Sequence, residues 1–197
     1  MNSRWIAFLA GTGAALAAGT VALAAGSGFP GDNGKPGLDG IMPPPAPPRP
    51  PGSAPPAPRP VAPAPPIAVA LRAAQAIAAG CKQFPLGVVV VNSAAQPILV
   101  YIPDGSRADH TYMALRKAYS AVTFGVNTSA MVKKAQTDPA VQAQIHADPN
   151  LIAYSGGILL KSGDKIVGAI GVSGSEPGAH DEECGMIGVA AIKDDLK

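Results

Sequence analysis

Hydrophobic residues recur at helical and then at strand spacing from Ile67 onward, and this alternation predicts the first elements of a folded domain. Over residues 67–80 apolar side chains recur every three or four positions, which predicts a helix that ends at Gly80. Residues 88–91 and 98–102 are short β-branched runs separated by small and polar residues, which predicts a hairpin. The first of these runs is four valines in a row, so we expect that strand to be covered on both faces.

A longer helix is predicted after this hairpin. Tyr112, Leu115, Tyr119 and Val122 form an apolar stripe at helical spacing. Asp109 is expected to be its N-cap, and the helix is expected to close at a glycine.

The rest of the chain repeats the same alternation. Two short helices are expected to begin at Thr128 and at Asp138, the second with a proline at its first position. Residues 158–161 and 165–172 are expected to form a second hairpin. A last helix is expected over 181–192, with three acids in its first turn, where the helix dipole favours negative charge. Hairpins that alternate with helices predict an α+β domain, an antiparallel sheet with helices packed on it.

The composition divides the chain before Ile67. Sixteen of the 22 prolines lie between Pro30 and Pro66. Residues 26–66 are therefore interpreted as a Gly/Pro-rich linker, a polyproline II spacer or a disordered leader that cannot form a core. Residues 67–197 make up 131 residues, which is enough for one domain with a buried core.

Residues 1–25 have the pattern of an export signal. Arg4 precedes an uncharged Ala/Gly-rich run from Trp5 to Ala25, and Ala22-Leu23-Ala24 fits a small-x-small cleavage site. We therefore expect an exported protein, periplasmic or secreted. The alternative is an uncleaved run of 21 residues that spans the bilayer and tethers the domain. No other contact with a membrane is expected.

Charge argues against nucleic acid as a partner. From Ile67 onward there are 11 lysines and arginines and 11 aspartates and glutamates. A formally neutral domain without a basic stripe is poorly suited to bind a phosphate backbone.

The two cysteines, Cys81 and Cys184, fall on the core side of the first and the last expected helix. In an exported protein two such cysteines are candidates for a disulfide. Two buried free thiols are the other interpretation, and the sequence leaves both open.

Several motifs for catalysis and metal binding are incomplete. Gly168, Gly171 and Gly174 are spaced by three, whereas a dinucleotide fingerprint is Gly-x-Gly-x-x-Gly in a βαβ unit. His180 and Cys184 are four residues apart on one helix, but one histidine and one cysteine fall short of a structural zinc set. No Gly-x-Ser-x-Gly elbow occurs. No metal site is therefore predicted, and the catalytic residues, if the protein is an enzyme, are unknown.

Three separated blocks carry a resemblance to a known family. "DGS…RKAYSAVTF", "GGILL…GDKIVGAIGVSG" and "DEEC…G.AAI" resemble the haem-binding protein/GlcG-like family, often described as a haem-degrading domain, and they match in order over 67–192. The resemblance implies a profilin-like α-β-α sandwich that assembles into homo-oligomers. It also implies a tetrapyrrole ligand, haem above all. Leu159 departs from the family pattern, because family members commonly carry proline there.

Haem would need axial ligands and partners for its propionates. The candidate ligands all lie at or near the start of an expected helix: His110, Tyr112, Met113 and His180. Arg116 and Lys117 match the basic pair of the family and are expected to pair with propionates. His146 has the setting of a surface residue.

These observations predict an exported haem-binding protein for haem sequestration, uptake or sensing, with haem breakdown as an additional activity to test. One alternative is a non-catalytic interaction module of the same fold, displayed on a proline stalk without a cofactor. A third is an enzyme of small hydroxy-acid metabolism, which rests on the GlcG resemblance alone.

Overall fold

The structure is a computed structural model that describes residues 50, 52, 60–175 and 178–196. The predicted signal peptide or anchor and most of the predicted linker therefore lie outside the described residues. Within the described ranges, no helix combines the length and the apolarity needed to cross a membrane.

Four strands form one antiparallel sheet. They are β1 (Gly87–Asn92), β2 (Pro97–Tyr101), β3 (Gly157–Ser162) and β4 (Lys165–Ser173), in the order β2-β1-β4-β3. The two predicted hairpins are thus joined along β1 and β4, which pair antiparallel. The second strand was expected to reach residue 102, but it ends one residue earlier.

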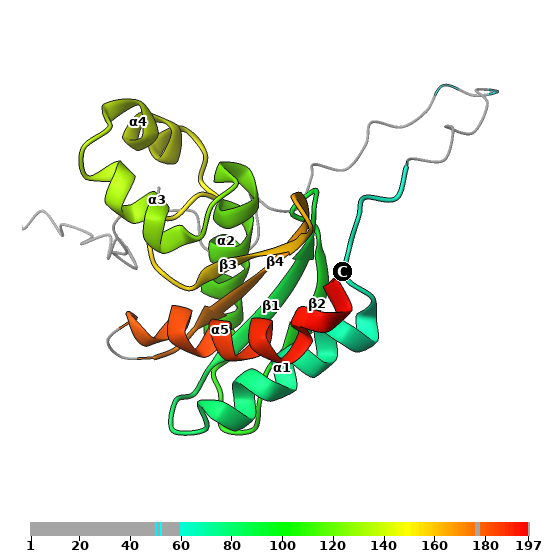
Figure 1. Ribbon diagram of the computed structural model, residues 1–197. Helices are drawn as coiled ribbons and strands as arrows, with labels where there is room; N and C mark the ends of the chain where they lie inside the picture. The colour runs from blue at the N-terminus through cyan, green and yellow to red at the C-terminus, as the bar shows by residue number, and fades with distance from the viewer. Residues whose placement is uncertain (1–49, 51, 53–59, 176–177, 197) are drawn as a thin grey trace, which may run out of the picture.

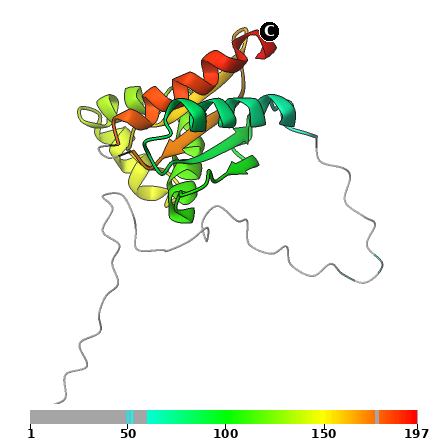
Figure 2. The ribbon, with the colours of Figure 1, turned by 90° about the horizontal axis from the view of Figure 1, so that it is seen from below.

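Helices cover both faces of this sheet (Figures 1 and 2). Helices α1 (Ile67–Gly80) and α5 (His180–Ile192) lie side by side and antiparallel on one face, and α2 (Ala108–Phe124) covers the other. The α5 helix begins one residue before its predicted start, and the 3₁₀ turn Lys193–Leu196 follows it. The predicted α+β sandwich, with an antiparallel sheet between helices, is confirmed.

The β1 strand is buried along its whole length, as its valines predicted. Val88 and Val90 contribute to the core beneath α1 and α5, while Val89 and Val91 pack under α2. Successive side chains of a strand point to opposite faces, so one run of valines supplies both cores.

The prediction for the apolar stripe of α2 was partly wrong. The residues that the sheet buries completely are Ala114, Ala118 and Ala121, whereas Tyr119 packs against a separate core beside the short helices. The reason lies in β4: a Cβ atom at Gly171 would stand 1.8 Å from the carbonyl oxygen of Ala114. The helix backbone therefore approaches the strand so closely that only small side chains fit between them.

The predicted N-cap of α2 was also wrong. The helix begins at Ala108 with Arg107 in the cap position, and no side chain caps it. Asp109 lies in the first turn, where an Arg107 nitrogen is 2.5 Å from its carboxylate. Asp109 is stabilised there by this ion pair and by the helix dipole.

The two short helices, α3 (Thr128–Ala135) and α4 (Pro139–Ala147), begin where they were predicted. The side chain of Asp138 accepts hydrogen bonds from two backbone N–H groups of α4, and Pro139 occupies the first helical position. Both helices lie beyond the end of α2 and close a small core of their own (Figure 1).

Cys81 and Cys184 are joined by a disulfide, which is the bridged alternative of the two that the sequence left open. Their Cα atoms are 6.0 Å apart and both residues are buried. The bridge ties the end of α1 to the N-terminal part of α5, and its two cysteines are 103 residues apart in the sequence.

Candidate functional site

A hollow of about 280 Å³ lies at the end of the sheet where β4 finishes, between the first turns of α2 and α5. It collects polar side chains and glycines from four segments that are far apart in the sequence. Its lining residues are His110, Met113, Lys117, Tyr154, Ser173, Gly174, Ser175, Gly178 and Asp181.

One side of α2 supplies three of these residues. His110, Met113 and Lys117 are separated by three and four positions, so they stack along one face of the helix. The alanine face of the same helix is held against β4. This packing fixes how far the three side chains project past the end of the sheet.

His110 is held in one orientation by a backbone carbonyl. Its Nδ1 lies 2.5 Å from the carbonyl oxygen of Pro85, and because a carbonyl can only accept, Nδ1 must carry the proton. In the neutral ring the lone pair is then on Nε2, the nitrogen that remains available to a ligand of the hollow. Histidines that bind metals commonly have this arrangement, with the other ring nitrogen donating to a carbonyl or carboxylate.

Gly174 makes room for that hydrogen bond. Its φ angle is +125°, a conformation that disfavours other residues. A Cβ atom at this position would lie 2.6 Å from His110 Nδ1 and 2.6 Å from the Pro85 oxygen. Gly174, the last of the three regularly spaced glycines, is therefore required by the His110–Pro85 hydrogen bond and does not belong to a dinucleotide-binding loop.

A buried ion pair forms the inner wall of the hollow. Lys117 Nζ lies 2.5 Å from Asp181 Oδ2 and 3.1 Å from the carbonyl oxygen of Val172. Burial lowers the pKa of Lys117, and the attraction of Asp181 opposes this shift. The other carboxylate oxygen of Asp181 accepts hydrogen bonds from the backbone N–H and the hydroxyl of Ser175. Asp181 thus connects α2, α5 and the loop after β4.

Arg116 and Lys117, the predicted basic pair, point to different places. Consecutive helical residues are rotated by about 100°, so two neighbours cannot line the same wall. Arg116 is fully buried, donates to the carbonyl oxygen of Leu151 and lies 5.8 Å from the centre of the Tyr112 ring. Pairing with a propionate remains a prediction for both residues, and only Lys117 borders the hollow.

His180 lies beside the hollow without lining it. Its ring stacks on Phe84, with 5.6 Å between the ring centres, and its Nδ1 is 2.7 Å from a carboxylate oxygen of Glu183. His146 is exposed on α4, where it borders a separate apolar hollow of about 450 Å³. Of the predicted ligands, the structure places His110 and Met113 at the hollow, and Tyr112 and His180 outside its lining.

Tyr154, like Asp181, is a site residue that sequence reasoning missed. It lies in the loop before β3, where no periodic pattern singled it out. It borders both the hollow and a neighbouring one of about 260 Å³, which also shares Lys117 and Gly178. Burial raises the pKa of Tyr154, and the positive charge of Arg116 opposes this shift. The two hollows share Lys117, Tyr154 and Gly178 and are therefore adjacent, and together they are called the groove.

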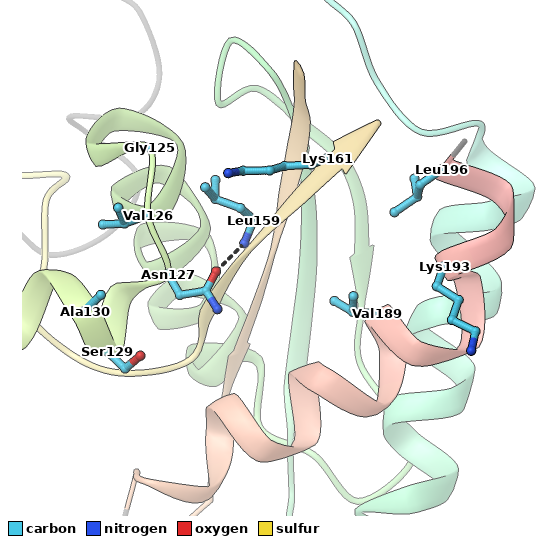
Figure 3. Close-up of a pocket in the computed structure, with 10 residues that line it drawn as sticks. All are labelled: Gly125, Val126, Asn127, Ser129, Ala130, Leu159, Lys161, Val189, Lys193 and Leu196. Carbon is cyan, nitrogen blue, oxygen red and sulfur yellow. Dashed lines mark hydrogen bonds between the residues drawn. The ribbon is translucent and has the colours of Figure 1, made fainter. Parts of the chain in front are cut away.

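Another hollow, of about 570 Å³, lies across the edge strand β3, between the start of α3 and the end of α5 (Figure 3). Leu159 and Val189 contribute apolar side chains to it, and none of the predicted ligands lines it. Leu159, where family members commonly carry proline, donates its backbone N–H to Asn127 Oδ1 at 3.0 Å. Proline has no N–H and could not make this bond.

The lining of the hollow contains few metal-ligating side chains: His110, Met113 and an Asp181 that is paired with Lys117. Among the described residues, no group of three or more histidine, cysteine, aspartate or glutamate side chains is placed to hold one. One histidine with a free Nε2, one thioether and one aromatic ring instead suit a ligand that brings its own metal, because such a ligand needs only one or two axial donors.

Comparisons with known proteins agree with this architecture. Residues 66–190 match the family model described as "Haem degrading protein HbpS-like". Among solved structures, a double mutant of HbpS from Streptomyces reticuli is 25% identical, with a TM-score of 0.61, and the match covers 72% of this chain and 99% of that one. No curated protein matched the sequence.

Two further structures share the fold at lower identity. ORFY from Klebsiella pneumoniae is 19% identical, with a TM-score of 0.61, over 72% of this chain and 98% of that one. A complex of PduOC with haem is 20% identical, with a TM-score of 0.59, over 66% of this chain and 95% of that one. At these identities the likeness shows the fold.

Proposed function

Because this chain belongs to the HbpS-like family of haem-degrading proteins, we propose that it binds haem in the groove beside His110. The observation that carries the proposal is the hydrogen bond from His110 Nδ1 to Pro85, which leaves Nε2 as the available ring nitrogen. The haem complex of PduOC, which has the same fold, supports the choice of ligand.

The residues present fit one face of a haem. His110 would hold the iron through Nε2, and Met113, one turn along the same side of α2, would be the alternative donor. Tyr154 gives the groove an aromatic surface against which a flat macrocycle can pack. Bound haem would supply an iron centre, and the chain's own part is to orient it and to limit the access of water.

Titration of the purified full chain with haemin tests this proposal. We expect a shifted Soret band at micromolar haemin in the wild type. His110→Ala should lose the shift or weaken binding at least tenfold, and added imidazole should restore it by replacing the missing ligand. His146→Ala is the matched control, because this histidine is exposed and borders a different hollow.

Two results would contradict the proposal. One is the absence of any spectral change with haemin in the wild type. The other is a His110→Ala spectrum identical to that of the wild type, and a changed spectrum in His180→Ala would then move the ligand to α5.

We further propose that the protein acts outside the cytoplasm, in haem sequestration, uptake or sensing. The export pattern of residues 1–25 supports this, and so does the Cys81–Cys184 disulfide, since such bridges persist in oxidising compartments. Intact mass of the protein recovered from cell fractions provides the test. We expect loss of a segment that ends near Ala24, and a full-length protein confined to the cytoplasm would contradict export. Incubation of the haem complex under air with a reductant separates sequestration from breakdown. A Soret band that persists for hours would indicate sequestration, and its loss would indicate breakdown.

A further inference from the structure

The short helices α3 and α4 enclose an apolar hollow that the proposed haem site does not use. Its volume is about 450 Å³, which is within the range of small-molecule pockets. Ala135 and Ile145 in its lining also belong to the small core of these helices, and the loop before β3 closes one side. This α3–α4 hollow is lined by Val132, Ala135, Gln136, Gln142, Ile145, His146, Ala153 and Tyr154.

Both helices present the same pattern of positions to the hollow. Each supplies three residues at positions i, i+3 and i+4, which lie on one side of a helix. They are Val132, Ala135 and Gln136 of α3 and Gln142, Ile145 and His146 of α4. The middle residue of each set is buried and the last is exposed. The α3–α4 hollow therefore has an apolar inner part and a polar mouth.

The space inside the hollow is left by small side chains between helices that are tied together. Gln142 Nε2 donates to the carbonyl oxygen of Ala135 at 2.7 Å, and Asp138 caps α4 just after the end of α3. Ala135 and Ala153 leave room that larger apolar side chains would fill. Protein interiors are normally packed without such gaps, so a ligand in the hollow would supply contacts that the chain lacks.

The absence of fixed charge in the lining restricts the kind of ligand. Among the described residues that form the α3–α4 hollow there is no lysine, arginine, aspartate or glutamate. The groove beside His110 contains Lys117 and Asp181. The hollow across β3 contains Lys161 and Lys193. A charged group is costly to bring into an apolar site without a partner, so the α3–α4 hollow favours a neutral molecule.

Tyr154 and the residues at the mouth define the ligand further. Tyr154 borders both this hollow and the groove, and its ring offers a surface on which another aromatic ring can pack. Gln136 and His146 can each donate and accept a hydrogen bond. We propose that the α3–α4 hollow binds a neutral aromatic molecule with a hydroxyl or carbonyl group, of the phenol or quinone class. The site lies next to the groove but does not depend on bound haem.

Fluorescence titration of the haem-free full chain with Nile red, a neutral aromatic dye with a carbonyl group, tests the proposal. We expect the wild type to bind at micromolar dye. Ala135→Leu fills the hollow and should weaken binding at least tenfold, while thermal unfolding should show no loss of stability because the added carbons occupy empty space. Ala130→Leu is the matched control: the same change at an exposed position of α3 that lines the other hollow should leave binding within twofold.

Competition in the wild type gives a second readout that needs no variant. Naphthol and naphthoate have the same two rings, but only naphthoate is an anion at neutral pH. We expect naphthol to displace the dye at least tenfold more effectively. Equal displacement by the two compounds would overturn the proposal, and so would undiminished dye binding by folded Ala135→Leu. Loss of dye binding in His110→Ala would place the dye in the groove and overturn it as well. All these titrations use haem-free protein, so a failure to bind haem would not change their outcome.

Discussion

The two faces of the sheet use opposite means to hold their helices. The face under α1 and α5 is apolar, and a disulfide joins the two helices over a core that includes Ile77 and Ile170. The face under α2 has a narrow alanine contact and, at its end, the buried pair of Lys117 and Asp181. We infer that the first face mainly stabilises the fold. The second face contributes less to stability, because it buries charged groups that form a polar site.

Removal of the disulfide should have the largest effect, on the apolar face. The chain-entropy model gives about 4.7 kcal/mol for a loop of about 100 residues, close to the 103-residue separation here. We expect Cys81→Ala/Cys184→Ala to lower the free energy of unfolding by about 4 kcal/mol, measured by urea denaturation. A loss below about 1 kcal/mol would show that packing alone holds this face. Wild-type protein under reducing conditions should behave like the double variant.

Breaking the buried ion pair should cost nearly as much on the α2 face. Lys117→Met leaves the Asp181 carboxylate buried without its cation, and removal of one partner of such a pair typically costs about 3–5 kcal/mol. Lys161→Met is the control, because Lys161 is exposed, and it should change stability by less than about 0.5 kcal/mol. Equal stability of the two variants in urea would contradict a structural role for the pair.

The smallest effect is expected from added methyl groups, and it should differ between the faces. Gly171→Ala drives a Cβ atom into the backbone oxygen of Ala114, so it should cost about 1–3 kcal/mol. Gly188→Ala on α5 meets the Ile77 side chain at 2.7 Å and the carbonyl oxygen of Ala73 at 3.0 Å, both longer than the 1.8 Å contact at Gly171, and alanine gains up to about 1 kcal/mol of helix propensity over glycine. Thermal unfolding should therefore show the smaller loss for Gly188→Ala. The reverse order would place the tighter contact on the disulfide-linked face.

Predictions from local patterns succeeded where the residues of a single element determine its structure. The valines of β1 encode burial on both faces, and Asp138-Pro139 encodes a helix start. They failed where a neighbour decides: the stripe of α2 was assigned to its large side chains, but the glycine in β4 selects the alanines. Asp109 was predicted to be the N-cap because aspartate is common there. In the structure Arg107 occupies the cap position, and Asp109 forms an ion pair with it.

The candidate site shows the same division. His110, Met113 and Lys117 could be named from the sequence, since they lie on one helix and the family resemblance draws attention to them. Tyr154 and Asp181 could not, because their role depends on the distance between a loop, α5 and α2 after folding. The sequence determined most of the elements, the family and the candidate ligands for the proposed tetrapyrrole. Only the tertiary structure decided which of them meet, because contacts between distant segments depend on close packing and not on local preference.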